Sequence, residues 1–491
     1  MGVSSASDGA LGWPAALWGS SRRPPAPALF SRFGVGPRRL PLLGLLPALM
    51  HDPIGALSAS APLGDVVSLG AQSALGPRVY LLNHPEAARQ VLVERSDRYG
   101  RPQGLMLSRQ LIGDGLFSSE GEAWQHQRRE TQHAFTNAPL SALSPLTAAL
   151  TDQLLARWAQ RAAQAEPVDL EEDMADLALC VVARALTGLD VSALLPTLRR
   201  ALTTVLWRLH RAALLPLALP TASGRRVREA LLIIEALAQG LIEARAQAPQ
   251  GPDLLWRLLS AHAPWLLSAH LSAARTAAED AAYHQKLRPV RDQLLTFLVA
   301  GYETVASGLT WLFELLAQHP QVEARVHEEI DALAGAIPTL ADLGEAGRLG
   351  YTRRTLDEVL RLYPPGWVIP RKVLREDQVA GFRIPRGAVV ILCPYLLHRH
   401  PGFWEAPERF DPDRFLPERS RARHRYAYLP FGAGPRRCIG QYFALLEMLT
   451  VVSRVARRVR LRPVGEPPQV ASRVVVLRTR EGALVHVLPR G

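Results

Sequence analysis

A single cysteine near the C-terminal end of the chain lies in a setting that suits metal binding. Cys438 belongs to the stretch Phe431-Gly-Ala-Gly-Pro-Arg-Arg-Cys438-Ile-Gly440, and an apolar helical pattern follows it. A helix N-terminus and the guanidinium groups of Arg436 and Arg437 favour the thiolate form of this side chain. Glycines let the backbone approach a flat ligand closely. The pattern indicates an axial thiolate ligand of haem iron, with a merely reactive or structural thiol as the alternative.

A second polar group interrupts a predicted core helix. The segment 293–316 is apolar all round except for Ala300-Gly301-Tyr302-Glu303-Thr304, so the helix should cross the core. A buried acid and alcohol are costly without partners. In a functional interpretation Thr304 hydrogen-bonds bound dioxygen, Glu303 delivers protons and Gly301 leaves room for the ligand. In a structural interpretation Thr304 bonds back to Ala300, and Glu303 meets an arginine.

A tryptophan and an arginine share one face of another predicted helix. Trp124 and Arg128 are four residues apart and follow the glycine-rich loop 111–117. An indole N–H and a guanidinium can together hold a carboxylate. A cation–π pair on a surface helix is the alternative interpretation.

A glutamate and an arginine further along the chain have the spacing of a buried ion pair. Glu358 and Arg361 stand three residues apart among apolar residues, in a helix that Pro364 and Pro365 end. Arg409 follows in Pro407-Glu-Arg409-Phe410, after a stretch rich in predicted strands. The alternative is a surface salt bridge, which contributes under about 1 kcal/mol to stability.

Taken together, these motifs resemble the cytochrome P450 family. Phe-x-x-Gly-x-Arg-x-Cys-x-Gly is the family's haem-binding signature, and residues 431–440 match every specified position. Residues 300–304 match its Ala-Gly-x-Asp/Glu-Thr motif. The resemblance implies a mainly α single large domain with a small β region, binding haem b. It also implies a monooxygenase that inserts one oxygen atom from O2 into a C–H bond.

The resemblance assigns a role to each motif residue. A haem-binding role is implied for Cys438, Phe431, Gly432, Gly434, Arg436, Gly440, Trp124, Arg128, Arg371 and Arg399, with the arginines and Trp124 near the propionates. A catalytic role is implied for Thr304, Glu303, Gly301 and Ala300. Trp367, Val368 and Leu116 are expected to face the substrate pocket, and Glu358, Arg361 and Arg409 to form a structural lock behind the haem loop.

Composition narrows the classes of partner. The 491 residues carry a formal net charge of +12, and nearly all of the basic surplus is arginine, which is typical of a GC-rich genome. No compact basic-aromatic module is present, so we expect no nucleic-acid partner. The three cysteines are too few for a disulfide framework, which favours a cytoplasmic protein. The apolar run 40–50 is too short to span a bilayer, which takes roughly twenty residues.

The sequence predicts one haem domain preceded by an N-terminal extension. Residues 1–36 show no steady period and are expected to be a poorly ordered extension, with the haem domain at 37–491. Helices are predicted at 143–162, 170–187, 192–212, 225–246 and 254–262, and strands at 66–69, 79–82, 382–384 and 388–392. The apolar connector 214–220 is expected to touch substrate or lipid, as in peripheral contact with the inner membrane face. The segment 263–291 is longer than the usual connection and predicts a short extra helix.

Substrate and electron donor follow from the resemblance alone. Residues 299–311, 361–367 and 443–447 resemble bacterial Thermus-type carotene ring hydroxylases, as well as fatty-acid and alkane hydroxylases. We therefore expect a lipophilic substrate, with a carotenoid first and a fatty acid or alkane as the alternative. A peroxygenase and a non-enzymatic haem sensor are further alternatives. No flavin-binding motif follows the haem domain, so a separate ferredoxin or flavodoxin and its NAD(P)H reductase should supply electrons.

Overall fold

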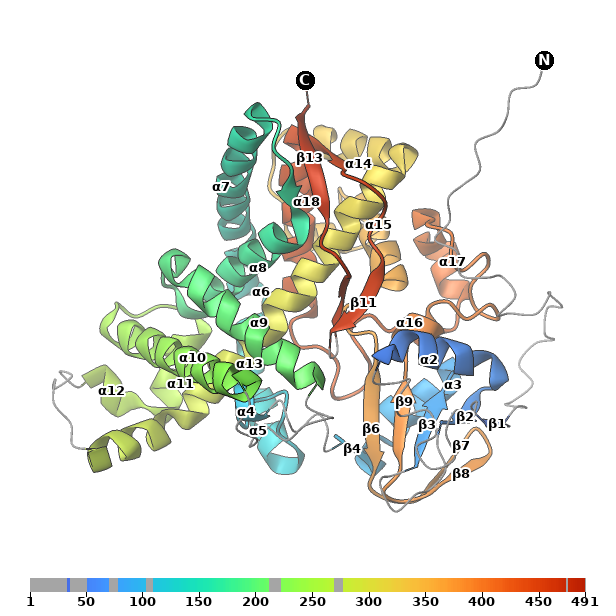
Figure 1. Cartoon of the computed structure of the whole chain (residues 1–491), viewed down its shortest axis with the longest axis horizontal. Coiled ribbons are helices and arrows are strands. Elements are labelled where there is room, and N and C mark those ends of the chain that lie inside the picture. Colours follow the sequence, from blue (N-terminus) through green and yellow to red (C-terminus); the bar gives the residue numbers. More distant parts are fainter. Residues whose placement is uncertain are drawn as a thin grey trace. The chain divides into compact units, whose positions relative to one another are not determined.

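The structure is a computed structural model that describes residues 33–35, 51–69, 78–102, 109–211, 222–268, 277–473 and 476–490. The connector 214–220 and most of the extension 1–36 lie outside the described residues. Near the end of that extension, strand β1 (Phe33–Val35) pairs in parallel with β2 (Val66–Ser68). The predicted class is confirmed, since helices dominate and the strands form small sheets (Figure 1).

The chain forms two compact units, each built from two separate segments. The first unit comprises residues 1–100 and 357–437, and the second comprises residues 101–356 and 438–491. The boundary near residue 357 falls inside helix α15 (Gly350–Leu362), and the one near 437 falls directly before Cys438.

The first unit is organised around a six-stranded mixed sheet. Its strand order is β1-β2-β3-β9-β6-β4, so strands from both segments alternate across the sheet. The strands predicted at 79–82 and 388–392 are confirmed as β3 (Val79–Leu82) and β9 (Val389–Leu392). Two further strands of this sheet, β6 (Ile369–Val373) and β4 (Tyr99–Gly100), were not predicted from the sequence. The strands β7 (Asp377–Val379) and β8 (Phe382–Ile384) form a separate hairpin.

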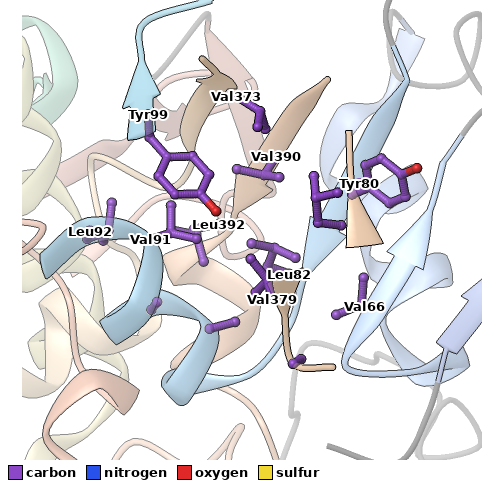
Figure 2. Packing of buried hydrophobic residues seen from close by; sticks show 14 of the residues in the cluster. Val66, Tyr80, Leu82, Val91, Leu92, Tyr99, Val373, Val379, Val390 and Leu392 are labelled. Atoms are coloured by element: carbon purple, nitrogen blue, oxygen red, sulfur yellow. The ribbon is translucent and has the colours of Figure 1, made fainter. Parts of the chain in front are cut away.

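Buried apolar side chains on this sheet make the core of the first unit. Figure 2 shows Val390 of the central strand β9 between Tyr99 on one side and Tyr80 on the other. Leu92, from the helical turn Gln90–Glu94, packs into the same cluster. The unit also contains the short helices α2 (Pro53–Ser60), α3 (Pro85–Arg89), α16 (Pro394–Leu397) and α17 (Pro417–Ala422).

The second unit is built on one long helix. The predicted helix 293–316 lies within α13 (Ala277–Gln318), which packs on α8 (Leu170–Thr187). Side-chain capping begins α8, because Asp169 accepts hydrogen bonds from the backbone N–H groups of residues 171 and 172. Gly188, in the left-handed conformation at φ 68°, ends it.

The remaining helices surround α13 and α8. The helix that follows Cys438, α18 (Gln441–Arg458), packs on α7 (Leu143–Ala163). The predicted extra helix in 263–291 is present as α12 (Pro264–Ser268), and the end of that segment belongs to α13. The other helices are α4 (Arg109–Ile112), α5 (Gly121–Thr131), α6 (Asn137–Ser141), α9 (Leu195–Arg211), α10 (Ala222–Gln247), α11 (Leu254–His262) and α14 (Pro320–Ala332).

Two small antiparallel sheets complete the second unit. One has the order β10-β13-β5, and the other is the hairpin β11-β12. Their strands are β5 (Val168–Asp169), β10 (Val459–Pro463), β11 (Val470–Arg473), β12 (Val476–Thr479) and β13 (Leu484–Pro489). None of the helices within the described ranges has both the length and the apolar composition of a membrane span.

Candidate active site

Cys438 differs from the other two cysteines in its exposure. It precedes Gly440, the N-cap residue of α18, and its side chain is exposed, whereas free cysteines are usually buried. Cys180 and Cys393 are buried, and burial raises the pKa of both thiols, that of Cys393 to about 12. These two side chains are therefore held as neutral thiols. Cys438 is the cysteine that combines access with a helix N-terminus, which favours the thiolate.

The glycines before Cys438 are explained by backbone shape and by protein packing. Gly432 and Gly434 have φ values of +68° and +70°, in the left-handed region that favours glycine. A Cβ atom on Gly434 would lie 1.8 Å from the carbonyl oxygen of Leu92. Gly434 is therefore required by contact with another part of the first unit, independently of any ligand.

Helix α13 has one accessible patch in an otherwise buried run. Residues 292–316 are buried except for Val299, Ala300, Gly301 and Thr304. Ala300 is exposed, and Thr304, one turn later, lies on the same face. This patch coincides with the motif that the sequence singled out, so it is the part of α13 that a ligand can reach.

Two residues of this motif have structural partners. The Thr304 hydroxyl donates to the Ala300 carbonyl over 2.8 Å, as the structural interpretation predicted. A Cβ atom on Gly301 would lie 2.7 Å from Cγ2 of Val182 in α8. Our expectation that Gly301 leaves room for a ligand is therefore corrected, because its missing side chain makes room for α8.

Glu303 points away from the accessible patch. Its carboxylate lies 2.7 Å from the guanidinium of Arg478 on β12, and both side chains are largely buried. Arg478 also contacts Glu171 at the start of α8, over 2.9 Å. The sequence anticipated an arginine partner for Glu303 without identifying which arginine.

An aromatic cluster links α5, α13 and α18 within the second unit. Phe135 lies shortly after α5. The centroid of its ring is 5.3 Å from that of Phe297 on α13 and 6.3 Å from that of Phe443 on α18. A Cβ atom on Gly440 would lie 3.7 Å from the Phe135 ring. The cluster therefore brings the cysteine-bearing end of α18 to α13, one turn from Ala300. Trp124 and Arg128 lie half-buried on α5, where their propionate-binding role remains a prediction.

The glycine-rich loop before α5 is fastened to the same helix. The backbone N–H of Asp114 donates to Asp292 over 2.8 Å, and that of Leu116 donates to Gln293 over 3.2 Å. Gly113 sits at φ +59°, where a Cβ atom would overlap the Asp292 carboxylate. Leu116 is buried, and its predicted place at the substrate pocket stays a prediction.

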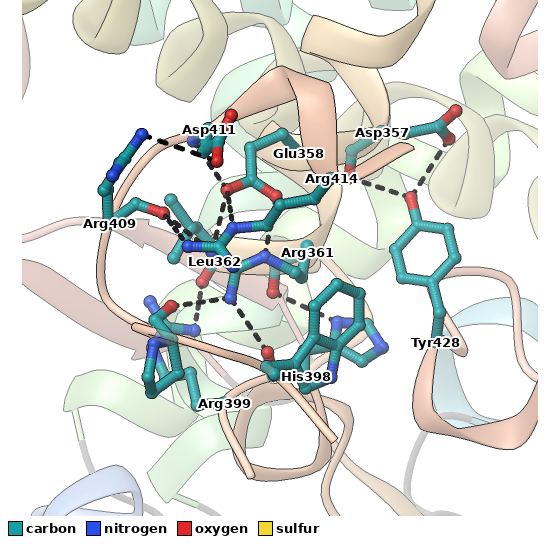
Figure 3. Close-up of polar contacts among 12 residues, drawn as sticks. Asp357, Glu358, Arg361, Leu362, His398, Arg399, Arg409, Asp411, Arg414 and Tyr428 are labelled. Atoms are coloured by element: carbon teal, nitrogen blue, oxygen red, sulfur yellow. Dashed lines mark hydrogen bonds and ion pairs between the residues drawn. The ribbon is translucent and has the colours of Figure 1, made fainter. Parts of the chain in front are cut away.

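In the first unit, the predicted Glu358–Arg361 pair is buried and forms the centre of a polar network (Figure 3). Two guanidinium nitrogens of Arg361 lie 2.7 and 2.8 Å from the two carboxylate oxygens of Glu358. The third nitrogen donates to the carbonyls of His398 and Pro407, over 2.9 and 2.7 Å. Neither side chain has measurable exposure, so the surface alternative is excluded.

The third member of this lock is Arg414 rather than Arg409. The Arg409 side chain is 72% exposed, and its ion pair is with Asp411. Arg414 is 8% exposed, and its Nε lies 3.3 Å from Oε1 of Glu358. The sequence held a signal for this, because Pro412-Asp-Arg414-Phe415 repeats the pattern of Pro407-Glu-Arg409-Phe410.

Arg399 also belongs to this network, which corrects its assignment to haem. Its Nε lies 3.1 Å from Glu408, Nη1 donates to the Leu362 carbonyl, and the guanidinium stacks 3.9 Å from the Tyr395 ring. Burial in these contacts leaves Arg399 a structural role. Arg371 on β6 is half-exposed and donates to the Pro370 carbonyl over 3.0 Å.

The roles of the other predicted residues of the first unit remain predictions. Among them, Phe431, Arg436 and Val368 are half-exposed, and Trp367 is buried.

His398, which the family resemblance offered only as a weaker candidate for a haem propionate, also belongs to this network. Its Nε2 accepts a hydrogen bond from the backbone N–H of Leu429 over 2.7 Å, and its Nδ1 contacts the Arg361 carbonyl at 3.1 Å. Because Nε2 accepts, Nδ1 carries the proton and donates. Burial lowers the pKa of His398 to about 3, so the ring is neutral. It ties the lock to the segment that leads into Phe431.

These residues fit a haem-thiolate group. The exposed Cys438, at a helix N-terminus, would supply the thiolate, and the accessible patch of α13 lies in the same unit as that cysteine.

Comparisons with known proteins identify the family of the chain. A family model described as cytochrome P450 matches residues 35–487. Cyclooctat-9-en-7-ol 5-monooxygenase of Streptomyces melanosporofaciens is 37% identical over 88% of this chain and 90% of its own length. Pentalenene oxygenase of Streptomyces avermitilis is 34% identical, with coverage of 84% and 88%.

A plant protein and a solved structure show the same similarity at greater distance. Protein LUTEIN DEFICIENT 5 of Arabidopsis thaliana is 28% identical over 84% of this chain and 71% of its own length. The structure of a cyanobacterial CYP120A1 with retinoic acid bound superposes with a TM-score of 0.78 and 25% identity. That superposition covers 94% of this chain and all of the other.

Proposed function

Since the chain belongs to the cytochrome P450 family and is therefore a haem-thiolate monooxygenase, we propose that its substrate is a terpenoid. The observation that carries the proposal is the full-length similarity to two oxygenases, one named for a terpene alcohol and one for pentalenene. The accessible patch on α13 is compatible with such a substrate, because Val299, Ala300 and Gly301 offer an apolar surface beside one hydroxyl.

A carotenoid remains the second candidate. It is supported by the similarity to the plant protein whose name refers to lutein, although that similarity is weaker than the bacterial ones. Carotenoids are themselves built from isoprene units, so the two candidates differ in size and shape more than in chemistry. Fatty acids and alkanes have no comparable support among these relatives.

The chain's own residues divide the chemical task between them. Cys438 would hold the haem iron, and Trp124, Arg128, Arg371 and Arg436 are our candidates for the propionates. The bound haem supplies activation of O2 and transfer of one oxygen atom to the substrate. Thr304 can turn its hydroxyl from the Ala300 carbonyl toward the accessible patch and hold a proton there. Glu303 would replenish that proton as a general acid.

Electrons are proposed to come from a separate ferredoxin or flavodoxin and its NAD(P)H reductase. The basic stretch 419–425 offers exposed charge, since the Arg419 side chain is 57% exposed. Arg423 in the same stretch is used internally, because its guanidinium stacks 3.9 Å from the Trp404 ring. We also propose a cytoplasmic location, because the three cysteines are not joined in disulfides.

Turnover with a surrogate donor system tests the proposed substrate class. The enzyme, ferredoxin, reductase and NADPH would be incubated with a polycyclic terpene hydrocarbon, its alcohol, β-carotene and a long-chain fatty acid. We expect mass spectrometry with isotopically labelled O2 to show one added oxygen atom in a terpene. Oxygenation of β-carotene alone would favour the second candidate, and oxygenation of the fatty acid alone would contradict both.

A further inference from the structure

One buried arginine is shared between two carboxylates beside the α13 motif. Arg478 on β12 lies 2.7 Å from Glu303 of α13 through Nη2 and 2.9 Å from Glu171 of α8 through Nη1. Thr479, the next residue of β12, donates a hydrogen bond to the other oxygen of Glu171. Ser307, one turn after Glu303, donates to the Leu477 carbonyl over 2.5 Å and so fastens β12 to α13.

This cluster is dry, so its ion pairs are strong. The Arg478, Glu303 and Glu171 side chains are 9%, 11% and 13% exposed. The crevice beside them, lined by Glu171, Ser307, Thr310 and Arg478, does not admit a water-sized sphere. Burial by itself lowers the pKa of Arg478, but the charges of Glu303 and Glu171 raise it above its usual value. Arg478 is therefore a permanent cation, and it is shared between the two carboxylates.

The arrangement conflicts with a simple role for Glu303 as proton donor. An ionised carboxylate held by a guanidinium has no proton to give, and Glu303 is turned away from the accessible patch. To act, Glu303 must leave Arg478 and take up a proton. Leaving a buried cation without any partner is strongly unfavourable. Glu171 removes that obstacle, because it still neutralises Arg478 after Glu303 departs.

We infer that Arg478 and Glu171 are positioning residues that control when Glu303 delivers protons. Arg478 holds Glu303 in the resting position, and Glu171 makes its release possible by keeping the guanidinium paired. The inference rests on the proposed role of Glu303 as a general acid in the monooxygenase reaction. Each turnover of that reaction consumes O2, two electrons from the donor and two protons from solvent. One oxygen atom enters the substrate, and the other leaves as water.

The first test removes the charge of Glu171 and keeps its shape. We expect E171Q to lower the rate of product formation roughly tenfold, because Glu303 then becomes the one carboxylate among the described contacts of Arg478. The ratio of product to NADPH should fall, and the rate ratio between H2O and D2O should rise, because proton delivery becomes limiting. E172Q is the matched control, since Glu172 is the next residue, is exposed and pairs with Arg199. Equal coupling in E171Q and E172Q would overturn the inference.

The second test needs neither substrate nor electrons. In R478Q the two carboxylates lose their cation, and we expect infrared spectroscopy to show an additional protonated carboxyl band that titrates near neutral pH. The band should be absent from E303Q/R478Q. R478K, which keeps the charge, should resemble the wild type, and the melting temperature shows whether each variant is folded. A folded R478Q without this band would refute the role of Arg478.

The two readouts separate this inference from the proposed substrate. If no terpenoid is oxygenated but R478Q shows the titrating carboxyl, the substrate proposal fails and the control of Glu303 by Arg478 stands. If a terpenoid is oxygenated and E171Q behaves as E172Q does, the substrate proposal stands and the positioning role fails. The double variant E171Q/R478Q should show the coupling of R478Q alone, because Glu171 acts only through Arg478.

Discussion

Arg414 and Glu358 are in contact 56 residues apart in sequence, with Nε of the arginine 3.3 Å from Oε1 of the glutamate. The Glu358 carboxylate therefore receives two guanidinium groups, from Arg361 on its own helix and from Arg414 on a distant turn. Both arginines also donate to backbone carbonyls, Arg361 to that of Pro407 and Arg414 to that of Ala406. This connection holds the polypeptide between the two arginines in one arrangement.

The two candidate arginines of the lock, Arg414 and Arg409, should differ in their contribution to the free energy of unfolding. R414A should lower the free energy of unfolding by about 2 kcal/mol, because it removes a buried ion pair with Glu358 and the hydrogen bonds that the guanidinium donates to backbone carbonyls. R409A should change it by no more than about 0.5 kcal/mol, because that side chain is exposed. Urea unfolding of both variants measures the difference. A larger loss in R409A would restore our original assignment.

The glycine before the cysteine allows a matched pair of substitutions. Gly434 and Gly381 both have left-handed φ values, +70° and +82°, but a Cβ atom on Gly381 would have no neighbour within 4 Å. G381A should therefore cost about 1 kcal/mol from backbone strain alone. G434A should cost at least about 2 kcal/mol more, because the new methyl group meets Leu92. Comparable losses in calorimetric stability would show that the contact is unimportant.

The cysteine assignment predicts a spectroscopic result. C438S should abolish the thiolate-type spectrum of the reduced CO complex, because serine does not supply a thiolate to the iron. C180S and C393S should keep that spectrum, since burial holds both thiols protonated. Retention of the thiolate spectrum in C438S, or its loss in C393S while haem is still bound, would show that the ligand has been misassigned.

The threonine on the accessible patch should govern the use of electrons. T304A is expected to lower the ratio of product to NADPH about tenfold or more, with peroxide formed instead, because the hydroxyl no longer holds a proton at the site. T310A is the control, since Thr310 lies on the same helix but is buried and bonds to the Ala306 carbonyl. Unchanged coupling in T304A would refute the relay.

His398 should make stability depend on pH. Its pKa is lowered to about 3 in the folded protein, and the unfolded side chain titrates near 6.5. The unfolded state therefore binds the proton first, so this residue's contribution to stability is complete above pH 6.5 and falls progressively toward pH 3. H398Q should reduce the protons taken up on unfolding between pH 7 and 5, whereas H126Q, at an exposed position, should not. Urea unfolding at several pH values measures this uptake, and equal slopes would contradict the prediction.

Local patterns in the sequence were sufficient to locate the main elements of the site. The cysteine loop, the acid–alcohol motif and the Glu358–Arg361 pair each lie within ten consecutive residues, where helix periodicity and spacing decide which side chains share a face. The predicted burial of the Glu358–Arg361 pair is confirmed. Cys438 is exposed and Ala300 lies on an accessible patch, and their roles toward haem and O2 remain predictions. The helices at 143–162, 170–187 and 254–262 were likewise predictable from the spacing of their apolar residues.

Only the tertiary structure decided which distant groups meet. Arg414 is buried against Glu358 and Arg409 is exposed, although both stand in the same tetrapeptide pattern. Burial depends on how the chain folds back and not on the neighbouring residues in sequence. In the folded protein Arg399 belongs to the buried polar network, and α8 occupies the space beside Gly301. Arg478 lies between Glu303 and Glu171. Contacts between residues that no single helix or strand joins leave no periodic trace in one sequence, since each partner satisfies its own local pattern.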